Sequence, residues 1–209
     1  IVVLLGALAV LGIAARVAVG SIVGALGDMS GAANGIASGR LDQKITHESD
    51  DEVGELAGAF RAMVAYIDGV SVAADRLARG DLSSTVAPRS ADDVLSHNIN
   101  RATETLRRIT SEAQLLIDAT RNGELARRGA PESFAGAYAE LISGINEMLD
   151  ALGRPIDEAR AVLEQVADRD LSARMSGDYH GDHGQIKSAL NSALVNIAGT
   201  FASLTSAIE

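Results

Sequence analysis

Apolar side chains recur at alternating three- and four-residue steps after the tetrapeptide Asp51-Glu52-Val53-Gly54. The stripe consists of Val53, Leu56, Phe60, Met63, Ile67, Val70, Ala74 and Leu77. A mean step of about 3.5 residues keeps these side chains on one seam of a helix, and this seam needs a partner helix to cover it. Asp51 and Glu52 lie where the helix is expected to begin, and free backbone N–H groups favour negative charge there. The pattern therefore predicts a coiled-coil helix from Asp51 to Leu77.

Four short segments that end in leucine repeat along the chain. Each has an amphipathic helix that ends near glycine or a polar pair, and the segments are Ile36–Leu41, Leu77–Leu82, Ala119–Leu125 and Val166–Leu171. Glycine relieves the left-handed strain that follows a helix end. We therefore expect helices to end near Gly39, Gly80 and Gly123, and the following leucines to pack back onto the helices.

A polar connector of about ten residues follows each of these leucines, and then a second amphipathic helix. Such a connector spans roughly 33 Å when extended, enough to return beside the first helix and start a second one parallel to it. Three of the second helices also place an asparagine one residue after a seam position: Asn100, Asn146 and Asn191. Two parallel helices leave their seams uncovered, so we expect a homodimer that closes a parallel four-helix bundle.

The joints between repeats differ. The apolar seam continues without a slip from Glu52 to Arg79 and from about Asp92 to Arg121, so one helix is expected to serve two repeats. Between the third and fourth repeats, Gly153-Arg154-Pro155-Ile156 interrupts the pattern. Proline is tolerated in a first helical turn but disrupts a helix interior. A break or bend is expected there.

The first fifteen residues are uncharged, and Arg16 is the only charged residue before Asp28. A bilayer-spanning helix needs about 20 apolar residues. The sequence begins without Met, so we interpret residues 1–23 as the end of a transmembrane helix and its membrane-proximal joint, with lipid contact at residues 1–16. A signal peptide and a buried core helix are the alternatives.

Composition narrows the function classes. Aromatic residues make up 3% of the chain and apolar residues 47%, which suits narrow helical seams better than a wide substrate-binding core. The net charge of −10 and the lack of basic clusters argue against nucleic-acid binding, and the absence of cysteine excludes thiolate chemistry. No cofactor is expected.

Two polar clusters are weighed as chemical sites. Asp178, His180, Asp182 and His183 are metal-ligand types, but a polar connector that leads into a helix is the preferred interpretation. Asp51 and Glu52 have no visible nucleophile or substrate pocket, so helix capping is preferred over acid–base catalysis.

The first and fourth repeats carry a recognisable order of motifs. The first reads Ala25-Leu26, Ser38-Gly39-Arg40-Leu41, Asp51-Glu52-Val53-Gly54 and Phe60-Arg61-Ala62-Met63; the fourth reads Arg154-Pro155-Ile156, Arg169-Asp170-Leu171, Asp182-His183-Gly184 and Leu190-Asn191. This order resembles the HAMP domain, the signal-relay module of membrane receptors and sensor kinases. The middle repeats keep Gly80-Asp81-Leu82 and Gly123-Glu124-Leu125 but lack the Asp-Glu-x-Gly motif, and the first repeat lacks the proline of the family.

The resemblance implies an all-α fold, with a transmembrane helix followed by tandem parallel four-helix bundles in a homodimer. Its expected HAMP units are 24–72, 66–115, 109–153 and 154–205. The expected relay motif residues are Asp51, Glu52, Gly54, Gly39, Leu41, Gly80, Leu82, Gly123, Leu125, Pro155, Leu171, Asp182 and Gly184. The expected bundle seam residues are Leu26, Met29, Ile36, Leu56, Phe60, Met63, Ile67, Ile99, Leu106, Ile145, Ile186 and Leu190.

The function implied by the resemblance is conformational relay, without enzymatic activity, in a bacterial inner-membrane receptor whose residues after about 20 are cytoplasmic. Repeated HAMP units behind a membrane helix are most similar to methyl-accepting chemotaxis receptors. These would act on a chemotaxis histidine kinase and its adaptor through a missing downstream domain. The linker of a sensor histidine kinase and a structural coiled-coil spacer are the alternatives.

Overall fold

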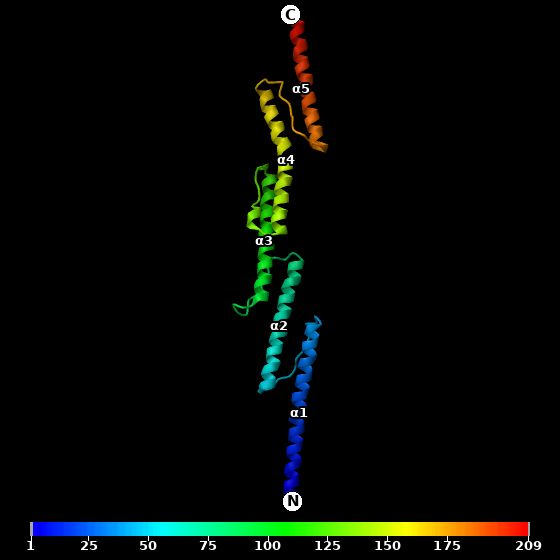
Figure 1. The fold of residues 1–209 in the computed structure, drawn as a ribbon, viewed down its shortest axis with the longest axis vertical. Helices are drawn as coiled ribbons and strands as arrows, with labels where there is room; N and C mark the ends of the chain where they lie inside the picture. Colours follow the sequence, from blue (N-terminus) through cyan, green and yellow to red (C-terminus); the bar gives the residue numbers. More distant parts are fainter. Residues whose placement is uncertain (1, 209) are drawn as a thin grey trace. The chain divides into compact units, whose positions relative to one another are not determined.

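A computed structural model describes residues 2–208, and the described residues form helices and connecting loops without strands (Figure 1). The elements in order are α1 (Val2–Ala37), α2 (Glu52–Ala78), α3 (Val94–Arg121), the short 3₁₀ helix η1 (Pro131–Ser133), α4 (Ala137–Ala167) and α5 (Gly181–Ile208). The all-α prediction is confirmed. The chain forms two compact units, one up to Leu106 and one from Arg107 onward.

The core of the first unit lies between α1 and α2, which pack side by side (Figure 1). Its buried residues are Ala25, Met29 and Ala32 of α1, Ile45 of the connector and Ala57 of α2. Most are small, so the two helices approach closely, and Ile45 fills the space that remains. The connector is thus part of the core.

The second unit repeats this arrangement between α4 and α5. Val162 of α4 and Leu194 of α5 are buried together with Ala173 and Met175 of the connector. Met175 follows Leu171 by four positions, as Ile45 follows Leu41. The connector again inserts one large apolar side chain against two parallel helices.

The prediction that the helix breaks at Gly153-Arg154-Pro155-Ile156 is wrong. α4 continues from Ala137 to Ala167 with Pro155 inside it, and both Gly153 and Pro155 are buried. Proline removes one backbone donor from a helix interior, and the helix nevertheless continues through this position, where Gly153 and Pro155 itself are buried. The expected boundary between 109–153 and 154–205 therefore falls within a helix.

Among residues 2–208, two helices are long and apolar enough to cross a membrane by length and composition. They are Leu4–Ala37 within α1 and Glu52–Ala78, which is α2. α2 carries Arg61 and Asp68 near its centre, which are costly in a bilayer, and it also buries part of its surface against α1. In α1, by contrast, Leu4, Leu8 and Leu11 are each more than half exposed. The stronger candidate span is therefore α1.

Candidate functional site: helix ends, connectors and seams

Four helix ends share one backbone geometry. Gly39, Gly80 and Gly123 adopt left-handed conformations with φ of 83°, 81° and 80°, and Arg169 does so at 71°. The N–H of each following residue donates to the carbonyl five positions earlier, as in Asp81 to Arg76 at 2.9 Å and Asp170 to Gln165 at 2.9 Å. This is the Schellman cap. The sequence indicated the three glycines, whereas no residue-type signal marked Arg169 as a left-handed position.

The motif leucines lie two residues beyond these left-handed positions. Leu41, Leu82, Leu125 and Leu171 are all half-buried. Two of them follow an aspartate that closes a tight turn, in which Asp81 accepts hydrogen bonds from the backbone and hydroxyl of Ser83, and Asp170 accepts the same from Ser172. These bonds lower the pKa of both carboxyls below the usual value.

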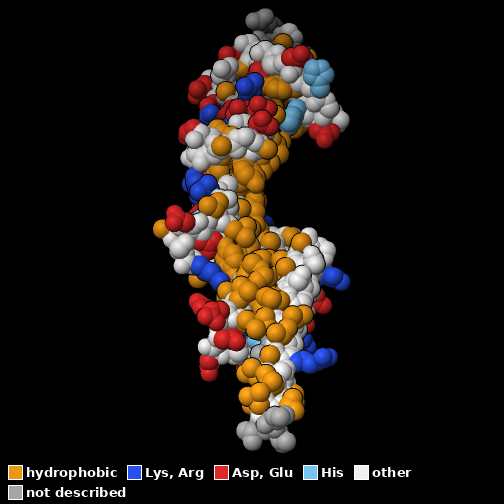
Figure 2. Space-filling view, turned by 60° about the horizontal axis from the view of Figure 1, so that its bottom comes forward, with side chains coloured by type: hydrophobic (Ala, Val, Ile, Leu, Met, Phe, Trp, Pro, Cys, Tyr) orange, Lys and Arg blue, Asp and Glu red, His pale blue; other side chains and the backbone are white. Residues whose placement is uncertain are grey.

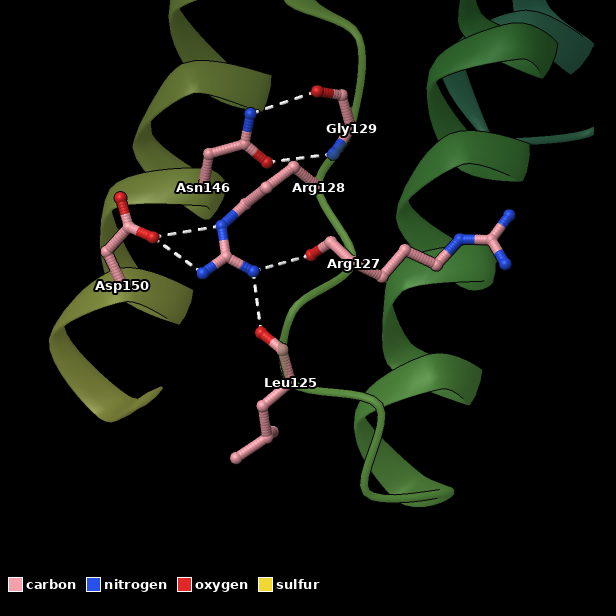
Figure 3. A network of polar contacts seen from close by, with 6 residues as sticks. All are labelled: Leu125, Arg127, Arg128, Gly129, Asn146 and Asp150. Atoms are coloured by element: carbon pink, nitrogen blue, oxygen red, sulfur yellow. Dashed lines mark hydrogen bonds and ion pairs between the residues drawn. The ribbon is translucent and has the colours of Figure 1, made fainter. Parts of the chain in front are cut away.

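An asparagine on the second helix grips the connector in three repeats. The side-chain amide of Asn146 donates to the carbonyl of Gly129 at 3.0 Å and accepts from the N–H of the same residue at 2.8 Å (Figure 3). Asn100 makes the same pair of bonds with Val86, and Asn191 with Met175. We call this arrangement the asparagine clamp. It fixes the connector residue four positions after the motif leucine.

The first repeat has arginine in the place of this asparagine. Arg61 Nη1 donates to the carbonyl of His47 at 2.7 Å and to that of Ile45 at 3.4 Å. The guanidinium has five donors and no acceptor. It therefore holds connector carbonyls but not connector N–H groups.

The third connector has an additional ionic anchor. Arg128 pairs with Asp150 of α4 through Nη2 at 2.5 Å and Nε at 3.0 Å, and its Nη1 donates to the carbonyls of Leu125 and Arg127 (Figure 3). The backbone is also tightly packed here, because a Cβ built on Gly129 would lie 2.8 Å from Ile142 Cγ2. Only glycine fits this position without a shift.

Glutamates on the first helix anchor the third and fourth connectors. Glu158 of α4 accepts from the N–H of Ser176 at 2.7 Å and of Gly177 at 3.1 Å, and Glu112 of α3 accepts from the N–H of Ala130 at 3.1 Å. A hydrogen bond from the Tyr179 hydroxyl and those backbone bonds lower the pKa of Glu158 to about 2. The same contact raises the pKa of Tyr179. Lys187 of α5 completes this anchor by donating to the carbonyl of Gly177 at 2.6 Å.

The two acidic residues at the start of α2 differ in their contacts. Asp51 caps the helix by accepting from the N–H groups of Val53 at 3.1 Å and Gly54 at 3.0 Å, and it also bonds the hydroxyl of Ser49. These bonds lower the pKa of Asp51, with the Ser49 bond as the largest cause. Glu52 and, at the corresponding place in α5, Asp182 are exposed.

The motif glycines lie where the connector backbone crosses its helix. A Cβ on Gly54 would overlap the carbonyl oxygen of Ser49, and a Cβ on Gly184 would lie 2.8 Å from the carbonyl oxygen of Tyr179. Both contacts reach back five residues along the chain. The glycines therefore let the connector end pass directly over the first turn of the second helix.

A polar cluster that the sequence did not indicate holds the second connector. Asp93 accepts from the hydroxyl of Tyr66, from the N–H of Arg89 at 2.9 Å and from the N–H of Ser96 at 3.1 Å. Arg89 lies over the Tyr66 ring at 4.6 Å and donates to the carbonyl of Ala62 at 2.8 Å. These bonds hold the pKa of Asp93 well below its usual value, with the Tyr66 contact as the main cause. In the sequence, the one sign of this cluster is Tyr66 next to a seam position, and the periodicity of apolar residues does not reveal which residue its hydroxyl contacts.

The expected seam residues are unequally covered within a single chain. Met29 is buried; Ile36, Phe60, Ile67, Ile99, Leu106, Ile145 and Leu190 are half-buried; and Leu26, Leu56, Met63 and Ile186 are exposed at 46%, 40%, 38% and 50%. Figure 2 shows hydrophobic side chains gathered at the surface. A large apolar surface of this kind marks an interaction site.

Open apolar grooves follow the seams of the second unit. One of about 600 Å³ lies between α4 and α5 and is lined mainly by Leu152, Pro155, Ile156, Ala159, Leu163 and Ile186. Another of about 380 Å³ lies between α3 and α4 and includes Leu116, Ile117, Ile145 and Met148. The polar side chains along these grooves are Arg160, Glu164 and His183 in the first and Thr120 and Arg121 in the second. Among residues 2–208, no group of three or more His, Cys, Asp or Glu side chains is placed to hold a metal, and this includes His180 and His183.

Comparison with known proteins identifies these features. Two HAMP domain models match the chain, one over residues 17–69 and the other over residues 133–199. The methyl-accepting chemotaxis protein McpB of Pseudomonas aeruginosa is 27% identical over 84 residues, which are 40% of this chain and 12% of McpB. The chain thus covers a small part of that relative. No solved structure matches.

The two matched ranges cover most of α1 and α2 in the first unit and α4 with most of α5 in the second. A HAMP array is a signal-relay linker, not a catalytic domain. The Schellman caps, the connectors and the uncovered seams recur through the chain in the order that the motifs predicted. The chain therefore carries HAMP domains at residues 17–69 and 133–199, and together these two domains support a HAMP array.

Proposed function

We propose that this chain is the relay segment of a transmembrane receptor and that it works as a parallel homodimer. The observation that carries the proposal is the exposed seam on helices that already pack against their connectors. Leu56, Met63 and Ile186 are exposed although each belongs to a regular heptad-like stripe. A second copy that presents the same stripe covers these side chains and closes each helix pair into a four-helix bundle.

Signal passes through such a bundle as a shift between two packings of the same seam. A stimulus shifts the equilibrium by its differential affinity for the two packings. Small seam residues, such as Ala33, Ala74, Ala102 and Ala113, allow helices to rotate or slide at low steric cost. Because α2 continues unbroken from Glu52 to Ala78, it serves as the second helix of the HAMP unit 24–72 and the first helix of the HAMP unit 66–115. A movement in one HAMP unit is therefore imposed on the next.

The relay connects a membrane or periplasmic sensor to a cytoplasmic output. α1 supplies the membrane end, with residues 1–16 in contact with lipid and the residues after about 20 in the cytoplasm beneath the bacterial inner membrane. The likeness to a chemotaxis receptor favours output through a downstream domain that acts on a chemotaxis histidine kinase and its adaptor. The alternative output is a histidine kinase domain in the same polypeptide.

Cysteine cross-linking tests the homodimer directly, since the chain contains no cysteine. The full-length receptor with Ile186→Cys is oxidised in membranes, and we expect a disulfide-linked dimer because equivalent seam residues face each other in a parallel bundle. Ser188→Cys is the matched control, since a residue two positions further lies on the opposite side of the helix. Equal cross-linking of the two variants would reject the parallel seam.

Insertion into α2 tests the relay. Two residues inserted after Ala65 rotate the seam, so receptor output should change or invert, whereas an insertion of seven residues restores the heptad phase and should preserve more of the response. An unaltered response to both insertions would argue against transmission through the helix.

Reconstitution with purified chemotaxis kinase and adaptor separates the two outputs. A chemotaxis receptor alters the activity of the added kinase, whereas a sensor kinase incorporates phosphate without it.

A further inference from the structure

The four connectors are anchored to different extents. In the second, third and fourth, an asparagine clamp binds both backbone groups of one connector residue: Val86, Gly129 or Met175. In the first connector the equivalent residue, Ile45, has only its carbonyl bound, by Arg61 at 3.4 Å. Within the described part of the chain, no helix side chain accepts a hydrogen bond from the backbone N–H groups of residues 41–50.

The later connectors also have second anchors, each built from different residues. The second is held by Asp93, Tyr66 and Arg89, and Arg89 reaches the carbonyl of Ala62 on α2. The third is held by Glu112 and by the ion pair between Arg128 and Asp150.

The fourth connector is held from both sides. Glu158 of α4 accepts from its N–H groups, and Lys187 of α5 donates to its carbonyls. Each of the three later connectors therefore bonds to its first helix as well as its second.

The first connector depends mainly on apolar packing. The side chain of Ile45 is buried against Ala25, Met29 and Ala57, and Arg61 donates to the carbonyl of His47 at 2.7 Å. Within residues 41–50, polar side-chain contacts are local, as between Gln43 and Asp42 or His47 and Ser49. A single apolar side chain and one flexible arginine make a weaker hold than a clamp supported by a second anchor.

We infer that the connector of residues 40–51 exchanges between a docked and an undocked position while the three later connectors stay docked. Undocking withdraws Ile45 from the space between α1 and α2 and frees these helices to repack. The cap of Asp51 stays in place at the far end, so the movement is confined to the connector. This makes the first repeat the compliant part of the array. The compliant role of the first repeat rests on the proposed relay function, whereas the exchange of its connector between two positions does not.

Thiol labelling of the full-length receptor in lipid nanodiscs tests this inference, because the side chains of Ile45 and Met175 are both buried while their connectors are docked. We expect Ile45→Cys to react with a maleimide about tenfold or more faster than Met175→Cys. Labelling rates of the two variants within about threefold of each other would overturn the inference.

Reciprocal substitutions give matched controls, because Arg61 and Ile45 are separated by 16 positions, the same separation as Asn191 and Met175. Arg61→Asn should install a clamp and slow the labelling of Ile45→Cys by about five- to tenfold. Asn191→Arg should remove a clamp and accelerate the labelling of Met175→Cys, while the labelling of Ile45→Cys stays unchanged. If neither substitution alters its own connector, the clamp does not control docking. Dimer cross-linking at Ile186 is independent of these results, so a failure here is distinguishable from a failure of the proposed function.

Discussion

Asn146 and Gly129 exchange two hydrogen bonds, at 2.8 Å and 3.0 Å, between a helix side chain and the main chain of a connector. An asparagine amide is suited to this pairing because it carries a donor and an acceptor side by side. The pair is half-buried, so water replaces it poorly when it is broken. The clamp thereby turns a flexible polar loop into a fixed part of the helix pair.

Asn146→Ala should lower the stability of the second unit by about 1–3 kcal/mol, because it leaves the N–H and carbonyl of Gly129 without their partner. Asn196→Ala is the control, since the side chain of Asn196 is exposed on α5. Urea unfolding followed by circular dichroism measures the difference. Equal midpoints for the two variants would contradict a structural role for the clamp.

Gly54→Ala should destabilise the first unit by about 1–3 kcal/mol, because the new methyl group overlaps the carbonyl oxygen of Ser49 and forces the connector to move. Gly69→Ala on the same helix has open space around it and should be neutral or stabilising, since alanine is the better helix former. Thermal unfolding of the two variants provides the measurement. A loss at Gly69 as large as that at Gly54 would show that helix composition, and not the contact with Ser49, is responsible.

Arg169→Gly should stabilise the fourth repeat by several tenths of a kcal/mol. Glycine removes about 1–2 kcal/mol of left-handed strain, and its greater freedom in the unfolded chain offsets about 0.4–1 kcal/mol of this. The opposite change at an equivalent cap, Gly123→Ala, should destabilise, because Gly123 has φ of 80°. Calorimetric unfolding of both variants tests the sign, and a stabilising Gly123→Ala would contradict the cap assignment.

Acidification should weaken the fourth connector through Glu158. Its pKa is lowered from 4.5 to about 2 in the folded protein, so the folded state binds this proton less readily than the unfolded state. The stabilisation that the ionised Glu158 gives to the folded protein is therefore present above about pH 5 and is lost as the pH falls toward 2. Glu158→Gln should reduce stability at pH 7 and make it less dependent on pH between 5 and 2.

The measurement for Glu158 is the urea midpoint of wild type and variant across that pH range. Tyr179→Phe should raise the pKa of Glu158 toward its ordinary value, because it removes the largest of the bonds that lower it. Parallel pH profiles for the wild type and Glu158→Gln would exclude the proposed anchor.

Regular features of this fold could be predicted from the sequence, because simple backbone rules produce them. Gly39, Gly80 and Gly123 mark helix ends since left-handed backbone favours glycine, and the three- and four-residue steps place the seams. The asparagines were visible as a recurring position next to the seam. The connector residues that these asparagines bind could not be predicted, because the clamp recognises main-chain atoms that are the same in every residue.

Other features depend on tertiary contacts that composition does not reveal. Arg169 occupies a left-handed position with an unfavourable residue type, so the repeat geometry outweighs local preference there. Pro155 lies within α4, where it and Gly153 are buried, although proline removes a backbone donor from the helix. Tyr66 and Asp93 lie 27 positions apart and meet only after the connector has folded back.

The asparagine clamp leaves the side chain of the gripped residue free to differ. Valine, glycine and methionine occupy that position in three repeats, and they differ widely in volume and flexibility. Duplicated copies of such a repeat can diverge in their connectors while their backbone path is preserved. Residues 70–132 match neither family model, yet they contain two docked connectors of the same construction. The repeats are thus more alike in the path of their main chain than in their amino-acid sequences.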